Sequence, residues 1–517
     1  MINIDEILLE KLNEQQFRII NAHENRIVVH AGPGSGKTYT LVRMIEKKLG
    51  SIPDYKGVIA CSFTKEASNQ LKEKTESLCD IRHSFIGTID AFVLTEIISP
   101  FKNRFLNSLG LKPLESEFRF EFPTQQSSAN FLTRQGITST NRGEINQYCK
   151  QWLNKLSKGV YEISFPSYLY AAKMIKDLDI ISSYIDGRYD AIYIDEAQDM
   201  NEFQHKFLEV IAGYCKLDIV LIGDRNQSIY QFRGARPELF FDLRSKGFTE
   251  YEITYSVRCH KSILDYSNML LIENYDFDLT GDVRIKLNHP PSVENILNIS
   301  GNFLIVCETR SVIDNVYRYL MENNIDVVLS RRLEIADKVF SDNYLELVEE
   351  TVRFYLNVLN DNPKLIYSIE SYKNFVSNFV TIDLIKDKDI VPDKEELLHY
   401  LLRIFGVYNI DVPNEIIKYL ESNIGDRLVL NQYTNYDSNI NRIMTIHASK
   451  GLESDNVFVI LDRPFTYDSE YKRKMFVAFS RAKHFLYISK SKDARTSNQP
   501  YDHLLVKNLE LITNMYK

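Results

Sequence analysis

The sequence predicts an α/β fold built from parallel sheets with helices on both faces. Short runs rich in β-branched and aromatic residues alternate with helical stretches along much of the chain, and parallel strands need such helical crossovers. Two long intervals, at about 93–180 and about 333–436, lack buried-strand signals and are rich in amphipathic helical segments. We therefore expect two α/β domains, each interrupted once by a mainly helical subdomain.

The first elements carry the clearest pattern. An apolar strand that begins at Arg26 runs into a glycine-rich turn, and apolar residues then recur at helical spacing as Leu41, Val42, Ile45 and Leu49. Further strands are expected at 58–63, 85–89, 191–195, 219–224, 251–255, 303–308, 442–447, 457–462 and 485–489. Further helices are expected at 65–78, 201–212, 261–271 and 312–321.

The interruptions suggest the domain boundaries. We expect the first α/β domain at 1–92 and 181–260, with its insert at 93–180. The second is expected at 261–332 and 437–517, with a reduced insert at 333–436. At roughly 100–200 residues per domain, a chain of 517 residues has room for this layout.

Composition excludes several classes of protein. With 44% hydrophobic and 26% charged residues, the chain is neither disordered throughout nor fibrous. Its net charge of −8, from 62 Lys and Arg against 70 Asp and Glu, excludes a surface that is basic all over but not a local basic groove. The six cysteines show neither C-x-x-C spacing nor Cys/His pairing, so neither a zinc site nor a disulfide framework is readable, and we expect mostly buried thiols. No run approaches the ~18 apolar residues of a membrane span, and the acidic N-terminus lacks an apolar leader, so we expect a cytoplasmic chain without a membrane partner.

The glycine-rich turn has the pattern of a phosphate-binding loop. Backbone N–H groups of such a loop cradle phosphates, Lys37 is expected to reach the β- and γ-phosphates, and the Thr38 hydroxyl is expected to bind Mg²⁺. Ala31 stands where the first glycine of the motif is usual. The candidate nucleotide-binding residues are Ala31, Gly32, Pro33, Gly34, Ser35, Gly36, Lys37, Thr38 and Tyr39.

A second acidic motif ends an apolar strand. The run from Tyr189 to Asp199 places Asp195 and Glu196 together 158 residues after Lys37, as 195 − 37 gives. We assign Asp195 to Mg²⁺, directly or through water, and Glu196 to general-base activation of the attacking water.

The segment Leu-Ile-Gly-Asp-Arg-Asn-Gln-Ser-Ile-Tyr-Gln-Phe-Arg-Gly-Ala at 221–235 resembles the third motif of UvrD/Rep-like superfamily 1A helicases. Other blocks that look like motifs of this family occur in the expected order, at 12–16, 61–67, 86–92, 254–260, 444–453 and 477–482. The resemblance implies two RecA-like P-loop NTPase motor domains that use ATP and Mg²⁺ on single-stranded or tailed DNA, with 3′→5′ polarity.

The same resemblance implies roles around the nucleotide. Gln16 would recognise adenine, and Gln227 would sense the γ-phosphate. Arg258 and Arg481 would act as arginine fingers, and Glu453 would contact the ribose or phosphate region.

It also implies contacts with the DNA strand. Aromatic rings stack on any base, which suits a moving enzyme. The implied stacking residues are Phe63, Tyr230 and Phe232, and the implied sugar or phosphate contacts are Thr88, His447 and Lys450.

Some positions depart from the family pattern. Val257 stands where an aromatic usually stacks on adenine, and Tyr255 or Tyr39 are the candidates to replace it. Lys65-Glu66 stands where Asn-Lys is common, and Asp90 where a histidine is usual. Two other conspicuous residues, His30 and Trp152, are expected to be packing residues.

The compact plan and the segment 84–101 resemble the helicase-like B subunit of bacterial Gabija anti-phage systems. This resemblance implies a partner nuclease of the OLD/TOPRIM type, because the sequence itself shows no nuclease constellation. Two alternatives stay open at this point: a stand-alone repair helicase, and a nucleotide-gated DNA sensor in which strand separation is incidental.

Overall fold

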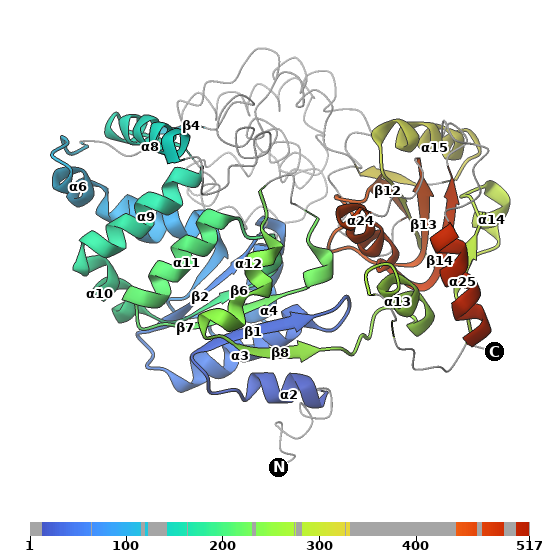
Figure 1. Ribbon diagram of the computed structural model, residues 1–517, viewed down its shortest axis with the longest axis horizontal. Coiled ribbons are helices and arrows are strands. Elements are labelled where there is room, and N and C mark those ends of the chain that lie inside the picture. Colours follow the sequence, from blue (N-terminus) through green and yellow to red (C-terminus); the bar gives the residue numbers. More distant parts are fainter. Residues whose placement is uncertain are drawn as a thin grey trace, which may run out of the picture. The chain divides into compact units, whose positions relative to one another are not determined.

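The computed structural model describes residues 13–63, 65–114, 119–121, 142–162, 164–229, 234–272, 275, 282–325, 327–330, 441–462, 468–490 and 503–515. The chain divides into two compact units. The first contains Met1–Ile285, Pro464–Leu486 and Asn498–Lys517, and the second contains Lys286–Arg463 and Tyr487–Ser497 (Figure 1). The expected second insert, 333–436, lies outside the described residues.

The first unit is organised around a six-stranded sheet with the strand order β3-β2-β6-β7-β1-β8. All of its neighbouring strands run parallel. The strands are β1 Arg26–Ala31, β2 Gly57–Ser62, β3 Phe85–Thr88, β6 Tyr189–Ile194, β7 Asp218–Gly223 and β8 Thr249–Ile253. The predicted α/β class is therefore confirmed.

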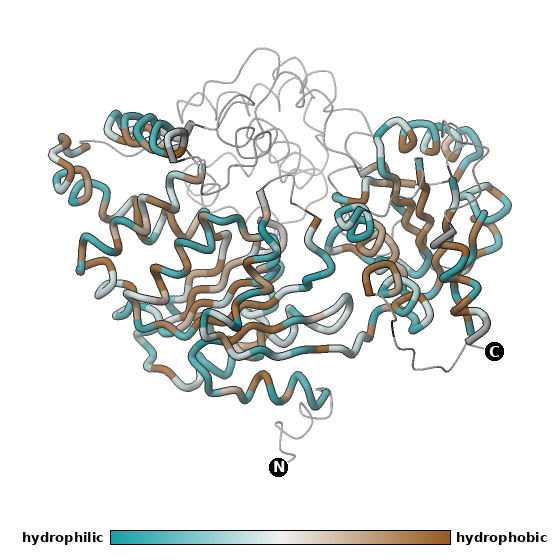
Figure 2. The backbone as a smooth tube through the Cα atoms, in the orientation of Figure 1, coloured by the Kyte–Doolittle hydropathy of each residue, from teal (hydrophilic) through white to brown (hydrophobic). Residues whose placement is uncertain are grey.

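Helices cover both faces of this sheet because successive side chains of a strand point to opposite sides. Ile27, Val29 and Ala31 of β1 belong to one core, which includes Leu41 and Ile45 of helix α3. Val28 belongs to the other core, with residues of α9 and α11. The central strands are accordingly hydrophobic along their length (Figure 2). The helices of this unit outside 89–188 are α2 Glu14–Ile20, α3 Lys37–Ser51, α4 Lys65–Glu76, α11 Glu202–Tyr214, α12 Pro237–Phe241, α13 Lys261–Asn268, α24 Ser469–Phe479 and α25 His503–Met515.

The residues that the structure describes between 93 and 180 lie mainly in helices. Trp152 is buried and stacks on Tyr170 with 5.0 Å between ring centroids, which confirms it as a packing residue. Two strands of three residues each, β4 and β5, pair in parallel here although the sequence showed no strand signal. The elements from 89 to 188 are α5 Ile89–Phe92, the π-helical turn Val93–Ile98, α6 Ser99–Ser108, β4 Arg119–Glu121, α8 Arg142–Ser157, β5 Val160–Glu162, α9 Phe165–Asp177 and α10 Asp179–Arg188.

A second six-stranded sheet has the order β11-β12-β10-β13-β14-β9. Its central strand β10 is buried at every position and runs parallel to both neighbours, β12 and β13. The strands are β9 Ile285–Leu287, β10 Phe303–Cys307, β11 Val328–Ser330, β12 Arg442–Thr445, β13 Ser454–Leu461 and β14 Ala482–Lys490, with helices α14 Val293–Leu297 and α15 Arg310–Glu322. Among the residues described, no helix is both long enough and apolar enough to cross a membrane.

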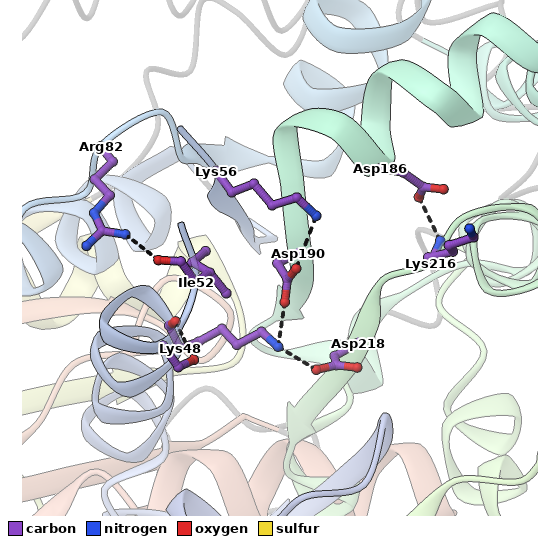
Figure 3. A network of polar contacts seen from close by, with 9 residues as sticks. Lys48, Ile52, Lys56, Arg82, Asp186, Asp190, Lys216 and Asp218 are labelled. Carbon is purple, nitrogen blue, oxygen red and sulfur yellow. Dashed lines mark hydrogen bonds and ion pairs between the residues drawn. The ribbon is translucent and has the colours of Figure 1, made fainter. Parts of the chain in front are cut away.

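A charged network lies at the amino ends of β6 and β7 (Figure 3). Lys48 Nζ, near the end of α3, lies 2.6 Å from Asp190 Oδ2 and 2.7 Å from Asp218 Oδ2. Lys56 Nζ lies 3.2 Å from Asp190 Oδ1. Burial acts to raise the pKa of Asp190, but the two ammonium groups outweigh it and lower that pKa below its ordinary value. The network ties the end of α3 to the sheet edge opposite the glycine-rich loop.

Candidate nucleotide site

The glycine-rich loop joins β1 to α3 at the carboxyl edge of the first sheet. Gly34 and Gly36 adopt left-handed backbone angles, with φ of 66° and 79°. A Cβ on Gly34 would lie 2.2 Å from Arg258 Cβ, and one on Gly36 would lie 2.7 Å from Gln16 Nε2. Only glycine fits both the backbone conformation and these close approaches.

Polar side chains hold the loop in shape. Lys37 Nζ donates to the carbonyl oxygens of Ala31 and Gly32, at 3.2 Å each. Ser35 Oγ donates to Gly32 O at 2.7 Å. A phosphate oxygen is a stronger partner for an ammonium group than a neutral carbonyl, so Lys37 is placed to turn to phosphate when one enters the loop. The backbone N–H groups of the loop and the ammonium group of Lys37 are together suited to the negative charge of a polyphosphate.

Gln16 borders the loop from helix α2. Its side chain belongs to a capping box, since Gln16 Oε1 accepts from Asn13 N while Asn13 Oδ1 accepts from Gln16 N. Its Nε2 also donates to Ser35 O at 3.1 Å. The residue assigned to adenine is therefore fixed against the loop, and its role with the base stays a prediction.

Asp195 follows β6 and faces the start of α3. Its N–H donates to Cys61 O at 2.8 Å, and its Oδ2 accepts from Thr38 Oγ1 at 3.3 Å. Burial, followed by the charge of Glu196, raises the pKa of Asp195 to about 6. A buried carboxylate beside a hydroxyl is a hard-oxygen pair of the kind that Mg²⁺ takes, and a cation would offset its desolvation. The residues therefore fit the expected metal.

Glu196 has the backbone angle of a strained residue, with φ of 55° in the left-handed region. Non-glycine residues in this region cluster at functional sites. Its Oε2 accepts from Gln198 Nε2 at 2.5 Å. The turn thus separates two neighbouring carboxylates, so that Asp195 faces Thr38 and Glu196 meets Gln198.

Gln227 and Arg481 meet in the same unit. Gln227 lies in the 3₁₀ turn after β7, and its Oε1 accepts from Arg481 Nη2 at 3.1 Å. Arg481 Nε donates to Val477 O at 2.9 Å, and the side chain is buried. Burial, and after it the charge of Arg258, lowers the pKa of Arg481 to about 10. The structure therefore brings Arg481 together with Gln227 and keeps a second guanidinium, Arg258, within electrostatic reach.

The segment after β8 closes over the loop. Ser256 Oγ donates to Pro33 O at 2.6 Å, and Val257 N donates to Gly34 O at 3.0 Å. The side chains of Val257 and Tyr255 are exposed. The centroid of the Tyr39 ring lies 5.3 Å from Arg43 Cζ. Whether Tyr255 or Tyr39 stacks on a base stays a prediction.

The candidate strand contacts are distributed over both units. Phe63 is half-buried at the end of β2, and Thr88 Oγ1 caps helix α5 by accepting from Ala91 N at 3.2 Å. Tyr230 and Phe232 lie outside the described residues. His447 and Lys450 belong to the second unit, in the turn that follows β12. Glu453, the candidate contact to the ribose or phosphate region of the nucleotide, belongs to the same unit and lies just before β13.

Two side chains near these motifs, Asp90 and His30, take part in hydrogen bonding or packing. Asp90 accepts a hydrogen bond from Tyr168, and burial raises its pKa. His30 is buried against Phe240, which confirms it as a packing residue.

Gln198 and Ser256 were not assigned from the sequence. Gln198 lies inside the acidic motif, so it could have been assigned to the site from the sequence. Ser256 is brought to the loop only by the tertiary structure.

Comparison with known proteins agrees with this geometry. The AAA domain family matches residues 15–233, and the UvrD-like helicase C-terminal domain family matches residues 442–489. In these two segments the chain is similar to the UvrD-like helicases. The matched AAA segment contains the loop, Asp195, Glu196 and Gln227, and the C-terminal match contains Arg481.

Three curated relatives differ in how much of their length they share with this chain. The Gabija protein GajB of Bacillus cereus is 26% identical over 493 residues, which cover 89% of the chain and 92% of the relative. The ATP-dependent DNA helicase PcrA of Leuconostoc citreum is 22% identical over 300 residues, 52% of the chain and 40% of the relative. The ATP-dependent DNA helicase Rep of Buchnera aphidicola is 22% identical over 307 residues, 51% of the chain and 43% of the relative.

Proposed function

We propose that this chain hydrolyses ATP with Mg²⁺ and uses the reaction to move along or unwind DNA that is single-stranded or partly duplex. The observation that carries the proposal is the gathering of Lys37, Thr38, Asp195 and Glu196 at one sheet edge, with Gln227 and Arg481 paired in the same unit. The helicase names of two relatives support the same activity.

Each residue has a role that its contacts support. Lys37 and the loop N–H groups bind the phosphates, and Thr38 with Asp195 holds the metal, which supplies charge neutralisation on the phosphates. Glu196 accepts the proton of the attacking water. Arg481, with Arg258, donates to the charge that develops on the phosphoryl oxygens, and Gln227 links that arginine to the turn after β7.

On the DNA side, stacking by Phe63, Tyr230 and Phe232 would hold bases without reading their sequence. Thr88, His447 and Lys450 would contact sugar or phosphate. We propose 3′→5′ movement from the family resemblance, and the domain boundaries given above for the two motor domains and their inserts. A DNA substrate makes the cytoplasm the expected compartment.

The similarity to GajB over nearly the whole chain favours a defence role. We propose that the chain is the helicase-like component of an anti-phage complex with a partner nuclease of the OLD/TOPRIM type. Expression of the native operon should then yield a complex of the chain with that nuclease. Purification of the chain alone from the same operon would favour the stand-alone repair helicase.

Hydrolysis of ATP by the purified chain, measured with and without single-stranded DNA and alongside unwinding of a 3′-tailed duplex, tests the activity itself. We expect DNA-stimulated hydrolysis together with strand separation. Stimulated hydrolysis without strand separation would instead favour the nucleotide-gated DNA sensor.

A further inference from the structure

Gln198 is a buried side chain that connects Glu196 to the segment around Gln227. Its Nε2 donates to Glu196 Oε2 at 2.5 Å, and its Oε1 accepts from Asp224 N at 3.0 Å. The residue has 0% of its surface exposed. One amide therefore touches both the proposed base and the first residue of the segment 224–228.

The backbone of Gln198 is held by the same segment. Ser228 Oγ donates to Gln198 O at 3.2 Å, so the segment contacts Gln198 from both of its ends. Between these ends lies Gln227, whose N donates to Asp224 O at 3.0 Å and whose side chain meets Arg481. In the sequence the segment continues within two residues to Tyr230, a proposed strand contact.

The end of β7 is shaped to admit this amide. A Cβ on Gly223 would lie 2.3 Å from Gln198 Oε1 and 3.2 Å from Gln198 N. Any larger residue at 223 would therefore push the amide away from Asp224 N. A glutamine is also required at 198, because only an amide of this length offers a donor to a carboxylate and an acceptor to an N–H at once.

We propose that Gln198 is a positioning residue that orients the Glu196 carboxylate for water activation and makes that orientation depend on the segment 224–228. This inference rests on the proposed function, since it takes Glu196 as the base. When the segment shifts on strand binding, the Asp224 N–H carries the side-chain amide of Gln198 with it, and Gln198 moves Glu196 Oε2. The increase in hydrolysis rate caused by DNA therefore depends on the side-chain amide of Gln198.

Two variants test the two hydrogen bonds of the Gln198 side chain. Gln198→Glu keeps an acceptor for Asp224 N but removes the donor to Glu196 and adds a like charge beside it. Gln198→Met keeps the approximate size and removes both hydrogen bonds without adding charge. Ser228→Ala is the matched control, because it removes a hydrogen bond to the backbone of Gln198 and leaves both bonds of its side chain intact.

The test is the steady-state hydrolysis of ATP with and without single-stranded DNA, with nucleotide affinity and the thermal midpoint measured in parallel. For both Gln198 variants we expect kcat with DNA to fall by about 10- to 100-fold. We expect KM and nucleotide affinity to stay within about twofold, because the ground-state contacts are untouched. The ratio of rates with and without DNA should approach one, whereas Ser228→Ala should keep the wild-type ratio.

Three outcomes would overturn the inference. The first is wild-type kcat and DNA stimulation in both Gln198 variants. The second is a parallel loss of nucleotide affinity, kcat and thermal midpoint, which would make Gln198 a structural residue only. The third is loss of DNA stimulation in Ser228→Ala. Absence of hydrolysis by the wild-type chain would instead reject the proposed function, and with it the assignment of Glu196 as base.

Discussion

The two edges of the first sheet hold polar clusters of opposite character. At the amino edge, Lys48 and Lys56 pair with Asp190, and these ion pairs lower the pKa of the carboxyl group. At the carboxyl edge, burial raises the pKa of Asp195, and the neighbouring Glu196 has a left-handed backbone. Matched charges favour the folded state, whereas a buried carboxylate with a raised pKa is unfavourable until a ligand offsets it. We therefore expect the amino edge to stabilise the fold and the carboxyl edge to carry the chemistry.

The largest expected effect comes from removing the ammonium group of Lys37 at the carboxyl edge. Lys37→Ala removes the only side chain of the loop that carries a positive charge to the phosphates. We expect hydrolysis of ATP to fall by at least about 100-fold, while the thermal midpoint stays near that of the wild type. A large loss of thermal stability together with activity would show that this edge, too, is mainly structural.

Glu196→Gln tests the proposed base with a smaller change. The amide keeps the size of the side chain but cannot take a proton, so turnover should drop by about 100-fold or more. Binding of ATP should remain close to wild type, since the loop and Asp195 are intact. Equilibrium binding of a fluorescent ATP analogue, combined with steady-state hydrolysis, makes the measurement. Normal turnover in this variant would remove Glu196 from the role of base.

Asp190→Asn breaks the amino edge and should affect stability alone. We expect a loss of about 1–2 kcal/mol in the free energy of unfolding, with unchanged hydrolysis per folded molecule. Because folding lowers the pKa of Asp190, its contribution is fully present above the ordinary aspartate pKa and is lost as pH falls through the folded-state pKa. Urea unfolding at several pH values should therefore show the wild type and the variant converging in acid. A difference that persists at low pH would contradict the ion-pair account.

Lys56→Met is the mildest change to the same network. Its longer contact of 3.2 Å with Asp190, compared with 2.6 Å for Lys48, predicts a loss of under about 1 kcal/mol. Urea unfolding of this variant beside Asp190→Asn ranks the two contacts. An effect equal to or larger than that of Asp190→Asn would contradict this ranking of the two contacts.

The sequence predicted the long central strands and the glycine-rich loop better than the short outer strands of the sheets. Period and apolar runs were enough for β1, α3 and the two central strands β6 and β7, because buried parallel strands are continuous hydrophobic runs. Strands of three residues, such as β9 and β11, gave no signal, since the pattern needs more positions than they contain.

Site chemistry was predictable where it lies in one motif. The loop, Asp195 and Glu196 could be assigned from local spacing. The contact between Gln227 and Arg481 joins residues 254 positions apart, and the clamp of Gln198 on Glu196 depends on a left-handed turn. The first contact is not encoded in a local pattern and needs the tertiary structure. The second lies inside the acidic motif, but its geometry follows from the left-handed backbone of Glu196.

We propose that the carboxyl edge of the first sheet hydrolyses ATP in a reaction coupled to a DNA strand. The most direct test of this proposal is the rate of ATP hydrolysis by the purified chain with Mg²⁺, in the presence and absence of single-stranded DNA, with Glu196→Gln measured alongside. We expect hydrolysis that DNA increases and that the variant lacks. No hydrolysis, or hydrolysis that is indifferent to DNA or survives in the variant, would contradict it.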